Sequence, residues 1–484
     1  MKKAELVFVP TPARGHLIPS VEFAKRLVAQ DDRLSITMLI MDQKIDPNLN
    51  SYIDTLLSSS SERIKFIKFP QTPKPPEAAH QMVAIDLFFE SYKPFVKQVV
   101  AELVIQSNAT HDSPRLAGFV IDMLTTTMID VANDFGVPTY MFFTGGAGYL
   151  GLKLHAITHD NDLTELMNDP EAELIVPSFR NLVPAGVYPG ELLEKTTSSI
   201  IIKYDRRMFG ETKGIVVNTF MELESHALHS LSNASGKDHP PVYSVGPLLN
   251  LTHKDTIEWL DDQPPLSVVF LCFGSAGAMQ EEQIKEIACA LEHSKLRFLW
   301  SLRQPPQRSD GLYFPNDYED PNQILPQGFL DRTATIGKVI SWSSQKQVDV
   351  LAHPSIGGFV SHCGWNSVLE SIWFGVPIAT WPLYSEQQLN AFEIVKELTL
   401  AVEIKNDYRG EAFNSGMGDR INIVRAKEIE TSLRKLMEPD SEIRDRVKEM
   451  SEKSRKTMED GGSSHSSLAS FIYNVMDNFA IMYG

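Results

Sequence analysis

The sequence predicts an α/β protein made of two doubly wound domains, each with a parallel sheet covered by helices on both faces. Three observations support this fold class. Short apolar runs rich in β-branched residues alternate with amphipathic segments, as buried parallel strands and their crossover helices do. The alternation lapses over residues 247–262 and then restarts. The length of 484 residues also exceeds the size at which one hydrophobic core usually stops growing.

The first half contains six continuous apolar runs of the kind that strands buried on both faces need. They lie at residues 5–9, 35–40, 64–69, 116–122, 139–143 and 214–219. The segment 16–30, between the first two runs, is amphipathic and is expected to form a helix. Because strands that alternate with helices build a doubly wound sheet, residues 1–246 are expected to form the first domain.

The second half restarts the same pattern. Its apolar runs lie at residues 267–273, 297–302, 338–342, 357–362 and 377–382. Helices are expected at 281–294 and 366–375, so residues 263–455 should form a second doubly wound domain after a linker over 247–262. The chain ends in a further apolar segment. Residues 456–484 are therefore expected to form a helix that packs back on the first domain.

Composition and charge indicate a globular protein and argue against several partners. Hydrophobic residues make up 43% of the chain and charged residues 22%, which is enough apolar material for full cores. The formal net charge of −17 disfavours binding to nucleic acid or to an anionic membrane surface. No apolar run approaches the length of about 18 residues that spanning a bilayer needs, so no stable membrane insertion is expected.

Cysteine usage indicates a reducing compartment. Cys272, Cys289 and Cys363 are odd in number and show no CxxC spacing, so neither a disulfide framework nor a cysteine zinc site is expected. The apolar run near the N-terminus is too short for a secretory signal. We expect a cytoplasmic protein that acts as a monomer.

The stretch SHCGWNSVLES, from Ser361, gathers polar side chains where a strand ends and a helix begins. Ligands of doubly wound domains bind at the carboxyl ends of strands, and the amides of a helix N-terminus attract anions. Amides near Asn366 and Ser367, with the His362 side chain, could hold a diphosphate. Alternatively, Ser367 and Glu370 are the S-x-x-E of a capping box, which needs no ligand. The stretch alone leaves both interpretations open.

A longer stretch decides between them. Residues 342–388, from WSSQKQ to SEQQ, resemble the signature box of plant UDP-dependent glycosyltransferases that act on small molecules. The rest of the chain is similar to the same family, including GH at 15–16, WLDDQP at 259–264 and FGS at 273–275. The resemblance implies a GT-B fold, in which two Rossmann-like domains face each other across a cleft. It also implies a UDP-sugar donor, held mainly by the second domain, and a small-molecule acceptor.

The resemblance further implies a role for each polar position of the box. Trp342 would stack on uracil, and the Glu370 carboxylate would take both ribose hydroxyls. The residues implied for the diphosphate are Ser275, His362, Asn366 and Ser367, and those implied for the sugar are the backbone of Trp365, Glu386 and Gln387. Gln387 stands where this family usually has Gln when the sugar is glucose, so UDP-glucose is the expected co-substrate.

The sequence departs from the family pattern at the glutamine that contacts uracil. The family places it three residues after the Trp and six before the first His of the box. Here Gln345 satisfies the first spacing and Gln347 the second, as if two residues were inserted. Because a loop absorbs an insertion more readily than a helix, Gln347 is slightly favoured, and both are kept as candidates.

Transfer to a hydroxyl needs a base, since an alcohol or phenol attacks far better as it loses its proton. His16 follows one predicted strand, and Asp122 ends another at the same edge of the first domain. Each alone is more often a helix cap or a surface residue. Together they match the catalytic pair of the family, in which the carboxylate orients the imidazole and stabilises the imidazolium. Direct attack would invert the sugar centre, and Thr144 matches a family position near the sugar.

A metal ion is the competing way to neutralise a leaving diphosphate. Asp160 and Asp162 form a D-x-D, as in metal-dependent glycosyltransferases, but they lie in a hydrophilic stretch that indicates a solvated loop. The histidines show no ligand spacing such as H-E-x-x-H. We therefore expect no metal requirement and no cofactor besides the donor.

The acceptor pocket is expected to come from first-domain loops, which vary most between related enzymes. The candidate lining residues are Phe88, Phe89, Met123, Leu124, Phe142, Phe143 and Tyr149. Such a lining suits a flat phenolic or flavonoid, with a terpenoid as the second class. Each of these residues would fit a core position equally well.

Two other functions would keep part of this site. An epimerase or hydrolase would consume the nucleotide sugar without an acceptor, and a non-catalytic sensor would bind it without reacting. A sensor has no need of His16 and Asp122, and the pair at an acceptor-sized cleft weighs against an epimerase or hydrolase. The sequence therefore favours an inverting glucosyltransferase.

Overall fold

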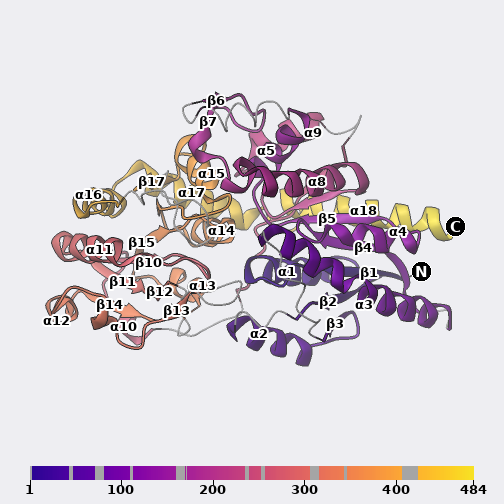
Figure 1. The fold of residues 1–484 in the computed structure, drawn as a ribbon, viewed down its shortest axis with the longest axis horizontal. Coiled ribbons are helices and arrows are strands. Elements are labelled where there is room, and N and C mark those ends of the chain that lie inside the picture. Colours follow the sequence, from indigo (N-terminus) through magenta and orange to yellow (C-terminus); the bar gives the residue numbers. More distant parts are fainter. Residues whose placement is uncertain are drawn as a thin grey trace.

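The computed structural model of the chain describes residues 3–42, 47–70, 81–109, 113–159, 169, 172–234, 239–251, 257–305, 315–342, 346–405 and 423–484. Two parallel sheets, each covered by helices, form two domains that lie side by side (Figure 1). Both chain ends lie at the end of the first domain that is remote from the second. The two Rossmann-like domains confirm the predicted GT-B fold class.

The first domain contains a seven-stranded parallel sheet. In sheet order its strands are β3 (Ile64–Lys68), β2 (Leu34–Ile40), β1 (Ala4–Val9), β4 (Arg115–Asp122), β5 (Thr139–Phe143), β8 (Ile215–Val217) and β9 (Val242–Ser244). Its helices are α1 (Arg14–Gln30), α2 (Pro47–Ser58), α3 (Gln81–Ala109), α4 (Ile129–Asp134), α5 (Ala147–Thr158), α7 (Gly190–Leu193), α8 (Lys195–Glu211) and α9 (Ser225–Ala234). All six predicted strands are present, and β9 was not predicted.

Alternate residues of each central strand pack into two different cores, which explains why the apolar runs are continuous. Leu6 and Phe8 of β1 pack with Phe23 of α1 on one face of the sheet. Val7 and Val9 pack on the opposite face with residues of α3, α4 and α5. A strand buried on both faces needs apolar side chains at every position.

The second domain contains a six-stranded parallel sheet. In sheet order its strands are β14 (Gly337–Ile340), β11 (Arg297–Ser301), β10 (Val268–Cys272), β15 (Ile356–Ser361), β16 (Ile378–Thr380) and β17 (Ala401–Glu403). Its helices are α10 (Glu258–Asp261), α11 (Glu281–Ser294), α12 (Phe329–Thr333), α13 (Gln347–Leu351), α14 (Trp365–Phe374), α15 (Gln387–Phe392), α16 (Ala426–Leu436) and α17 (Glu442–Lys456). The five predicted strands are present, and β17 is an addition.

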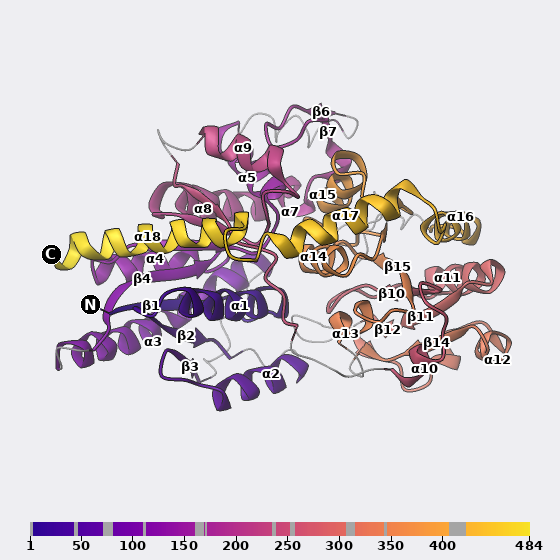
Figure 2. The ribbon, with the colours of Figure 1, turned by 180° about the vertical axis from the view of Figure 1, so that it is seen from behind.

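The last helix, α18 (Ser463–Tyr483), runs along the first domain (Figure 2). Phe471 and Val475 are buried in the same core as Phe23. The Tyr483 hydroxyl donates to the Leu116 carbonyl of β4 at 3.0 Å. The chain thus leaves the second domain through α17 and ends on the sheet where it began.

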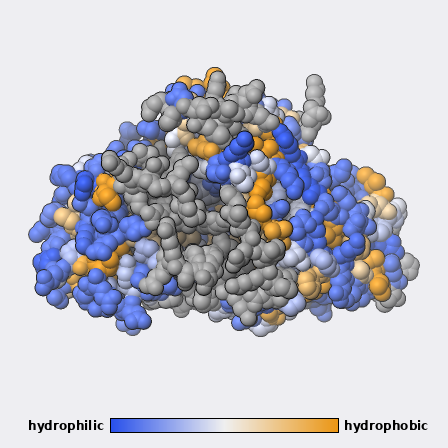
Figure 3. Space-filling view, in the orientation of Figure 1, coloured by the Kyte–Doolittle hydropathy of each residue, from blue (hydrophilic) through white to orange (hydrophobic). Residues whose placement is uncertain are grey.

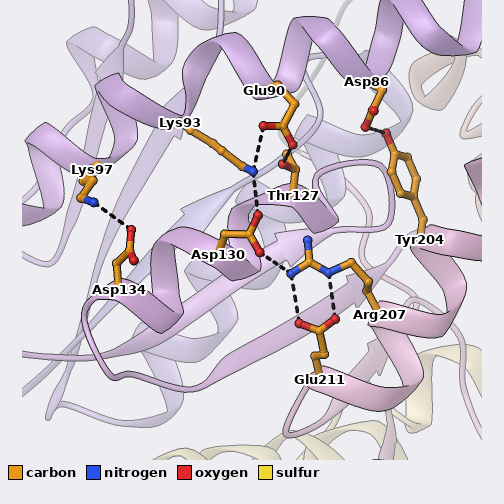
Figure 4. A network of polar contacts seen from close by, with 10 residues as sticks. All are labelled: Asp86, Glu90, Lys93, Lys97, Thr127, Asp130, Asp134, Tyr204, Arg207 and Glu211. Atoms are coloured by element: carbon orange, nitrogen blue, oxygen red, sulfur yellow. Dashed lines mark hydrogen bonds and ion pairs between the residues drawn. The ribbon is translucent and has the colours of Figure 1, made fainter.

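A polar network joins α3 to α4 and α8 on the outer side of the first domain (Figure 4). Asp130 of α4 lies at its centre, with Lys93 Nζ at 2.7 Å and Arg207 Nη2 at 2.6 Å. Arg207 also pairs with Glu211 one turn along α8 at 2.9 Å. The network fixes α3, the helix that carries Phe88 and Phe89, against its neighbours.

Hydrophilic residues cover most of the described surface on the face drawn in Figure 3, and apolar residues form small scattered groups. Among the described helices, none combines the length and apolar character that crossing a membrane requires.

Candidate active site

The first domain presents His16 and Asp122 as a hydrogen-bonded pair at the edge of its sheet. His16 lies in the first turn of α1, and Asp122 is the last residue of the adjacent strand β4. His16 Nδ1 is 2.8 Å from Asp122 Oδ2. The other carboxylate oxygen, Oδ1, accepts from Thr11 Oγ1 at 2.6 Å and from the Leu124 amide at 3.0 Å. With Nδ1 held by the carboxylate, Nε2 is left to accept a proton.

The environment strengthens His16 as a base. Burial of the imidazole lowers its pKa, but the charge of Asp122 and its hydrogen bond outweigh that effect, and Glu386 adds to them, so the pKa is raised. Glu386 belongs to the second domain, so the two domains act on one proton-accepting group. Thr144 is also close, with its Oγ1 3.1 Å from His16 Nδ1.

The start of α14 rules out the capping box. The helix begins at Trp365 and its N-cap is Gly364, so Ser367 is the third helical residue instead of the cap. Ser367 and Glu370 are one turn apart and share a partner: Gln347 Nε2 donates to Ser367 Oγ at 2.8 Å and to Glu370 Oε2 at 2.7 Å. Gln347 is the first residue of α13 and reaches α14 through these two hydrogen bonds, whereas Gln345 lies outside the described residues.

The Glu370 carboxyl has a pKa close to neutral pH. Its burial raises the pKa to about 7, although the Gln347 hydrogen bond and the charge of Arg14 act in the opposite direction. The carboxyl therefore changes charge in the physiological range. A ligand that donates hydrogen bonds to it favours the ionised form.

His362 lies beside α14 as a neutral imidazole. It is 7% exposed, its Nδ1 has no partner among the described residues, and burial lowers its pKa to about 4. The ring packs against two glycines: a Cβ at Gly274 would lie 2.3 Å from His362 Nε2, and one at Gly364 would lie 2.7 Å from it. Gly274 also has a φ of +76°, which favours glycine.

Trp342 and Ser275 are linked by a residue that the sequence did not indicate. Arg303 lies just after β11, with its guanidinium 5.4 Å from the centre of the Trp342 ring. It also donates to the carbonyl of Ser275. The Trp342 amide donates to Asp317 Oδ1 at 2.8 Å. Arg303 thus brings together the predicted uracil and diphosphate residues.

Glu386 is the N-cap of α15, and Gln387 is the first residue of that helix. Gln387 is 3% exposed, and its Oε1 accepts from the amides of Leu383 and Tyr384 at 2.9 and 3.1 Å. Ser385, just before them, donates from Oγ to Glu191 Oε1 of the first domain at 2.6 Å. The predicted sugar residues therefore stand at a contact between the domains.

The box also contacts the first domain directly. Asn366 Nδ2 donates to the carbonyl of Gly15, next to His16, at 2.8 Å. Trp365 Nε1 donates to the carbonyl of Asn218 at 2.8 Å. Asn218 follows β8 at the same sheet edge as Asp122, so its place at a strand end was the signal that could have revealed it.

The acceptor candidates fall into two groups. Met123 and Leu124 are half-buried directly after Asp122, and Phe88 is half-buried on α3. The nearly fully buried members are Phe89, Phe142, Phe143 and Tyr149. For Phe142 the structure corrects the expectation: its ring stacks on Phe23 at 5.0 Å in the core beneath α1 and α18, because its position on β5 points away from the α3 side.

The D-x-D motif formed by Asp160 and Asp162 was the predicted alternative to a metal-free site. Both residues lie outside the described part of the chain. Within the described part of the chain, no group of three or more His, Cys, Asp or Glu side chains is arranged to hold a metal ion.

Known proteins resemble this chain along its whole length. A family model described as UDP-glucoronosyl and UDP-glucosyl transferase matches residues 256–406. A UDP-glycosyltransferase of Malus domestica is 52% identical, over 97% of this chain and 99% of its own. A UDP-glucose flavonoid 3-O-glucosyltransferase of Fragaria ananassa is 50% identical, over 98% of this chain and 99% of its own.

A solved structure shows the same architecture. The Medicago truncatula UGT complexed with UDP-glucose superposes with a TM-score of 0.84 at 38% identity, and the match covers 98% of each chain. The similarity thus includes the first domain with His16 and Asp122 as well as the box in the second domain. The chain belongs to the UDP-glycosyltransferase family, as the resemblance of its sequence predicted.

Proposed function

We propose that the protein transfers glucose from UDP-glucose to a hydroxyl of a small phenolic acceptor, with a flavonoid as the first class to test and a terpenoid as the second. The products are a β-glucoside and UDP. The observation that carries this proposal is the pairing of His16 with Asp122 at 2.8 Å, next to the contact between Asn366 and Gly15. The names of the relatives, a flavonoid glucosyltransferase among them, support the donor and the acceptor class.

The reaction follows from the hydrogen bonds of His16. The acceptor hydroxyl gives its proton to Nε2 as its oxygen attacks the anomeric carbon of glucose. The bond from that carbon to the diphosphate breaks, and the electron pair leaves with UDP. Asp122 stays ionised and stabilises the imidazolium. Attack from the side opposite the leaving group turns the α-linked donor into a β-linked product.

The donor is held by the box of the second domain. Trp342 stacks on uracil, Gln347 contacts the base or ribose, and Glu370 accepts from both ribose hydroxyls. The residues assigned to the diphosphate are Ser275, His362, Asn366 and Ser367, and those assigned to the sugar are Thr144, Trp365, Glu386 and Gln387. The side chains assigned to the diphosphate and the first backbone amides of α14 are proposed to balance the negative charge of the leaving diphosphate, so that no metal is required.

The proposal also assigns a role to each segment of the chain and a location to the protein. Residues 1–246 bind the acceptor, 247–262 link the domains, 263–455 bind the donor, and 456–484 return to the first domain. The burial of Phe471 and Val475 in the first-domain core supports the last assignment. We propose that the protein acts as a monomer in the cytoplasm, which size-exclusion chromatography and a fluorescent fusion would test.

The test is a mass-spectrometric screen of the purified protein with UDP-glucose, a chelator and a panel of phenols, flavonoids and terpenoids. A product heavier than its acceptor by one hexose, formed in the presence of the chelator, is the expected result. Release of free glucose without an adduct would favour a hydrolase. Binding of UDP-glucose without turnover on any acceptor would favour a sensor.

A further inference from the structure

Two carboxyl groups that the transfer does not use meet where the domains contact each other. Glu224 immediately precedes α9 in the first domain and is 2% exposed. Glu393 is 3% exposed and begins the π-helical turn Glu393–Glu397, which continues α15 in the second domain. Acidic side chains are almost never this buried unless they are paired. The pair therefore needs a partner for its charge.

Both carboxyls pack on the first turn of α5. Glu224 Oε1 accepts from the Gly148 amide at 2.7 Å. Glu393 lies against the same residue, since a Cβ at Gly148 would fall 2.7 Å from Glu393 Oε2. Gly146, two residues earlier and the N-cap of α5, leaves room for Glu224 and the Trp365 ring, because a Cβ on Gly146 would lie 2.9 Å from each. Small residues here let the second domain approach α5 closely.

The other groups that face the pair supply no positive charge. The Thr219 hydroxyl and the Ala147 amide face Glu224, and Glu397 acts on Glu393 from the same turn. The Glu397 carboxylate is itself held by the amides of Arg180 and Asn181, at 3.0 and 2.8 Å. None of the groups that act most strongly on either carboxyl is a Lys, Arg or His side chain.

One proton shared by the two carboxyl groups removes their mutual repulsion. Glu224 Oε2 and Glu393 Oε2 are both buried, and neither has a donor partner among the described residues when both groups are ionised. Two adjacent carboxylates would also repel each other. Burial raises the pKa of both groups, but Glu224 accepts from amides of α5, which favour its ionised form, so Glu393 is the group that keeps the proton. In agreement, burial and the charge of Glu224 raise the pKa of Glu393 well above its usual value.

We propose that Glu393, as a carboxylic acid, donates a hydrogen bond to the Glu224 carboxylate across the two domains, and that this contact positions the sugar-binding and base residues relative to each other. Glu393 continues the helix that begins at Gln387, and the Glu224 carboxylate accepts from the Gly148 amide in the first turn of α5, the helix that follows Thr144. The two glutamates are positioning residues. Only the effect on turnover rests on the proposed function, because the shared proton can be tested without substrate.

The first test compares melting temperatures across pH for the wild type, E393Q and E397Q. A carboxyl whose pKa is raised by folding stabilises the protein at low pH, and that stability is lost as pH rises through the folded-state pKa. E393Q donates permanently, so its melting temperature should fall less than that of the wild type between about pH 6 and about pH 10. E224Q alters the Glu224 side of the same contact, and it is the variant to use if E393Q does not fold.

E397Q is the matched control. It removes an acid from the same turn and the same domain contact but leaves the shared proton in place. Its melting temperature should still fall as pH rises, by somewhat less than that of the wild type because losing a neighbouring negative charge makes Glu393 easier to ionise, whereas that of E393Q should fall least. Parallel curves for the wild type and E393Q over the whole range would overturn the shared proton.

The second test is the alkaline limb of kcat, measured with UDP-glucose and one phenol so that the ionisation of the acceptor is common to all variants. E393Q should move this limb to higher pH while the Kd for UDP stays within about twofold. An unchanged limb together with altered melting curves would overturn the positioning role. A wild type without transfer at any pH would instead contradict the proposed function, which the melting curves do not involve.

Discussion

At the scale of single residues, His16 is expected to affect the chemical step and not the binding of UDP. Its imidazole belongs to the first domain, whereas the box proposed to hold UDP belongs to the second. We predict that His16→Ala lowers kcat by about 10²- to 10⁴-fold, the usual contribution of a positioned base. The Kd for UDP, measured by calorimetry, should be unchanged. An equal loss of UDP affinity would show that His16 has a structural role instead.

Glu370 should make donor binding depend on pH. Its pKa of about 7 means that the carboxyl, neutral under acid conditions, becomes able to accept from both ribose hydroxyls as pH rises. UDP affinity of the wild type should therefore increase between about pH 6 and about pH 8, and E370Q should bind roughly ten- to a hundredfold more weakly without that increase. Calorimetry at several pH values measures both. A wild-type affinity that falls over this range would contradict the assignment.

Ionisation of the Glu370 carboxyl should lower the stability of the protein when no nucleotide is bound. Folding raises its pKa from 4.5 to about 7, so the wild type loses stability as pH rises through this window. E370Q cannot ionise and should gain on the order of 2 kcal/mol over the wild type at about pH 8, and little at about pH 5. Melting curves without nucleotide test this. A constant difference at all pH values would be the opposite result.

Gly274 should be required for the placement of His362. Gly274→Ala adds a Cβ 2.3 Å from the imidazole, and Gly136→Ala is the control because its φ of +67° is similar but its surroundings are open. Both variants should lose about 1 kcal/mol or more from backbone strain. Only Gly274→Ala should also weaken UDP binding, by roughly tenfold. Similar UDP affinities for the two variants would contradict a diphosphate role for His362.

At the scale of elements, segments within a predicted apolar run or amphipathic stretch were predictable. The run 267–273 became β10, and 281–294 is the helix α11. The strands β9 and β17 lie outside the predicted runs, whereas β8 and β16, which also have three residues each, lie within them. Turn chemistry left two interpretations open: Ser367 has the spacing of a capping box, but α14 starts at Trp365 with Gly364 as its N-cap.

Residues of the site were predictable where they follow strands or match the box. His16, Asp122, Ser367 and Glu370 were expected from such positions, and the structure brings each of them into a polar contact. Arg303 was not expected, because its contacts come from packing between segments distant in sequence. Glu224 and Glu393 were missed for the same reason.

The network on α3 should contribute modestly to stability. Asp130 binds both Lys93 and Arg207, whereas Asp134 of the same helix binds Lys97 alone. Asp130→Asn should lower stability by about 1 kcal/mol, and the control Asp134→Asn by a few tenths, because these pairs are exposed. Melting at low and high salt should show the difference shrinking with salt. Equal effects of the two variants would contradict a network.

At the scale of the whole molecule, the site exists only where the two domains meet. The first domain supplies His16 and Asp122, and the second supplies the box and Glu386. The contacts that hold the two domains together include those of Asn366 with Gly15, Ser385 with Glu191, and Trp365 with Asn218. Under the proposed function, neither domain alone has both the base and the donor site.

The decisive measurement is a proton NMR time course of the protein with UDP-glucose and a flavonoid that the mass-spectrometric screen identifies. A single direct attack assisted by His16 predicts one β-glucoside, seen from its large anomeric coupling, formed one for one with UDP. An α-glucoside would contradict direct inversion. Free glucose in place of a glucoside would contradict transfer to the acceptor.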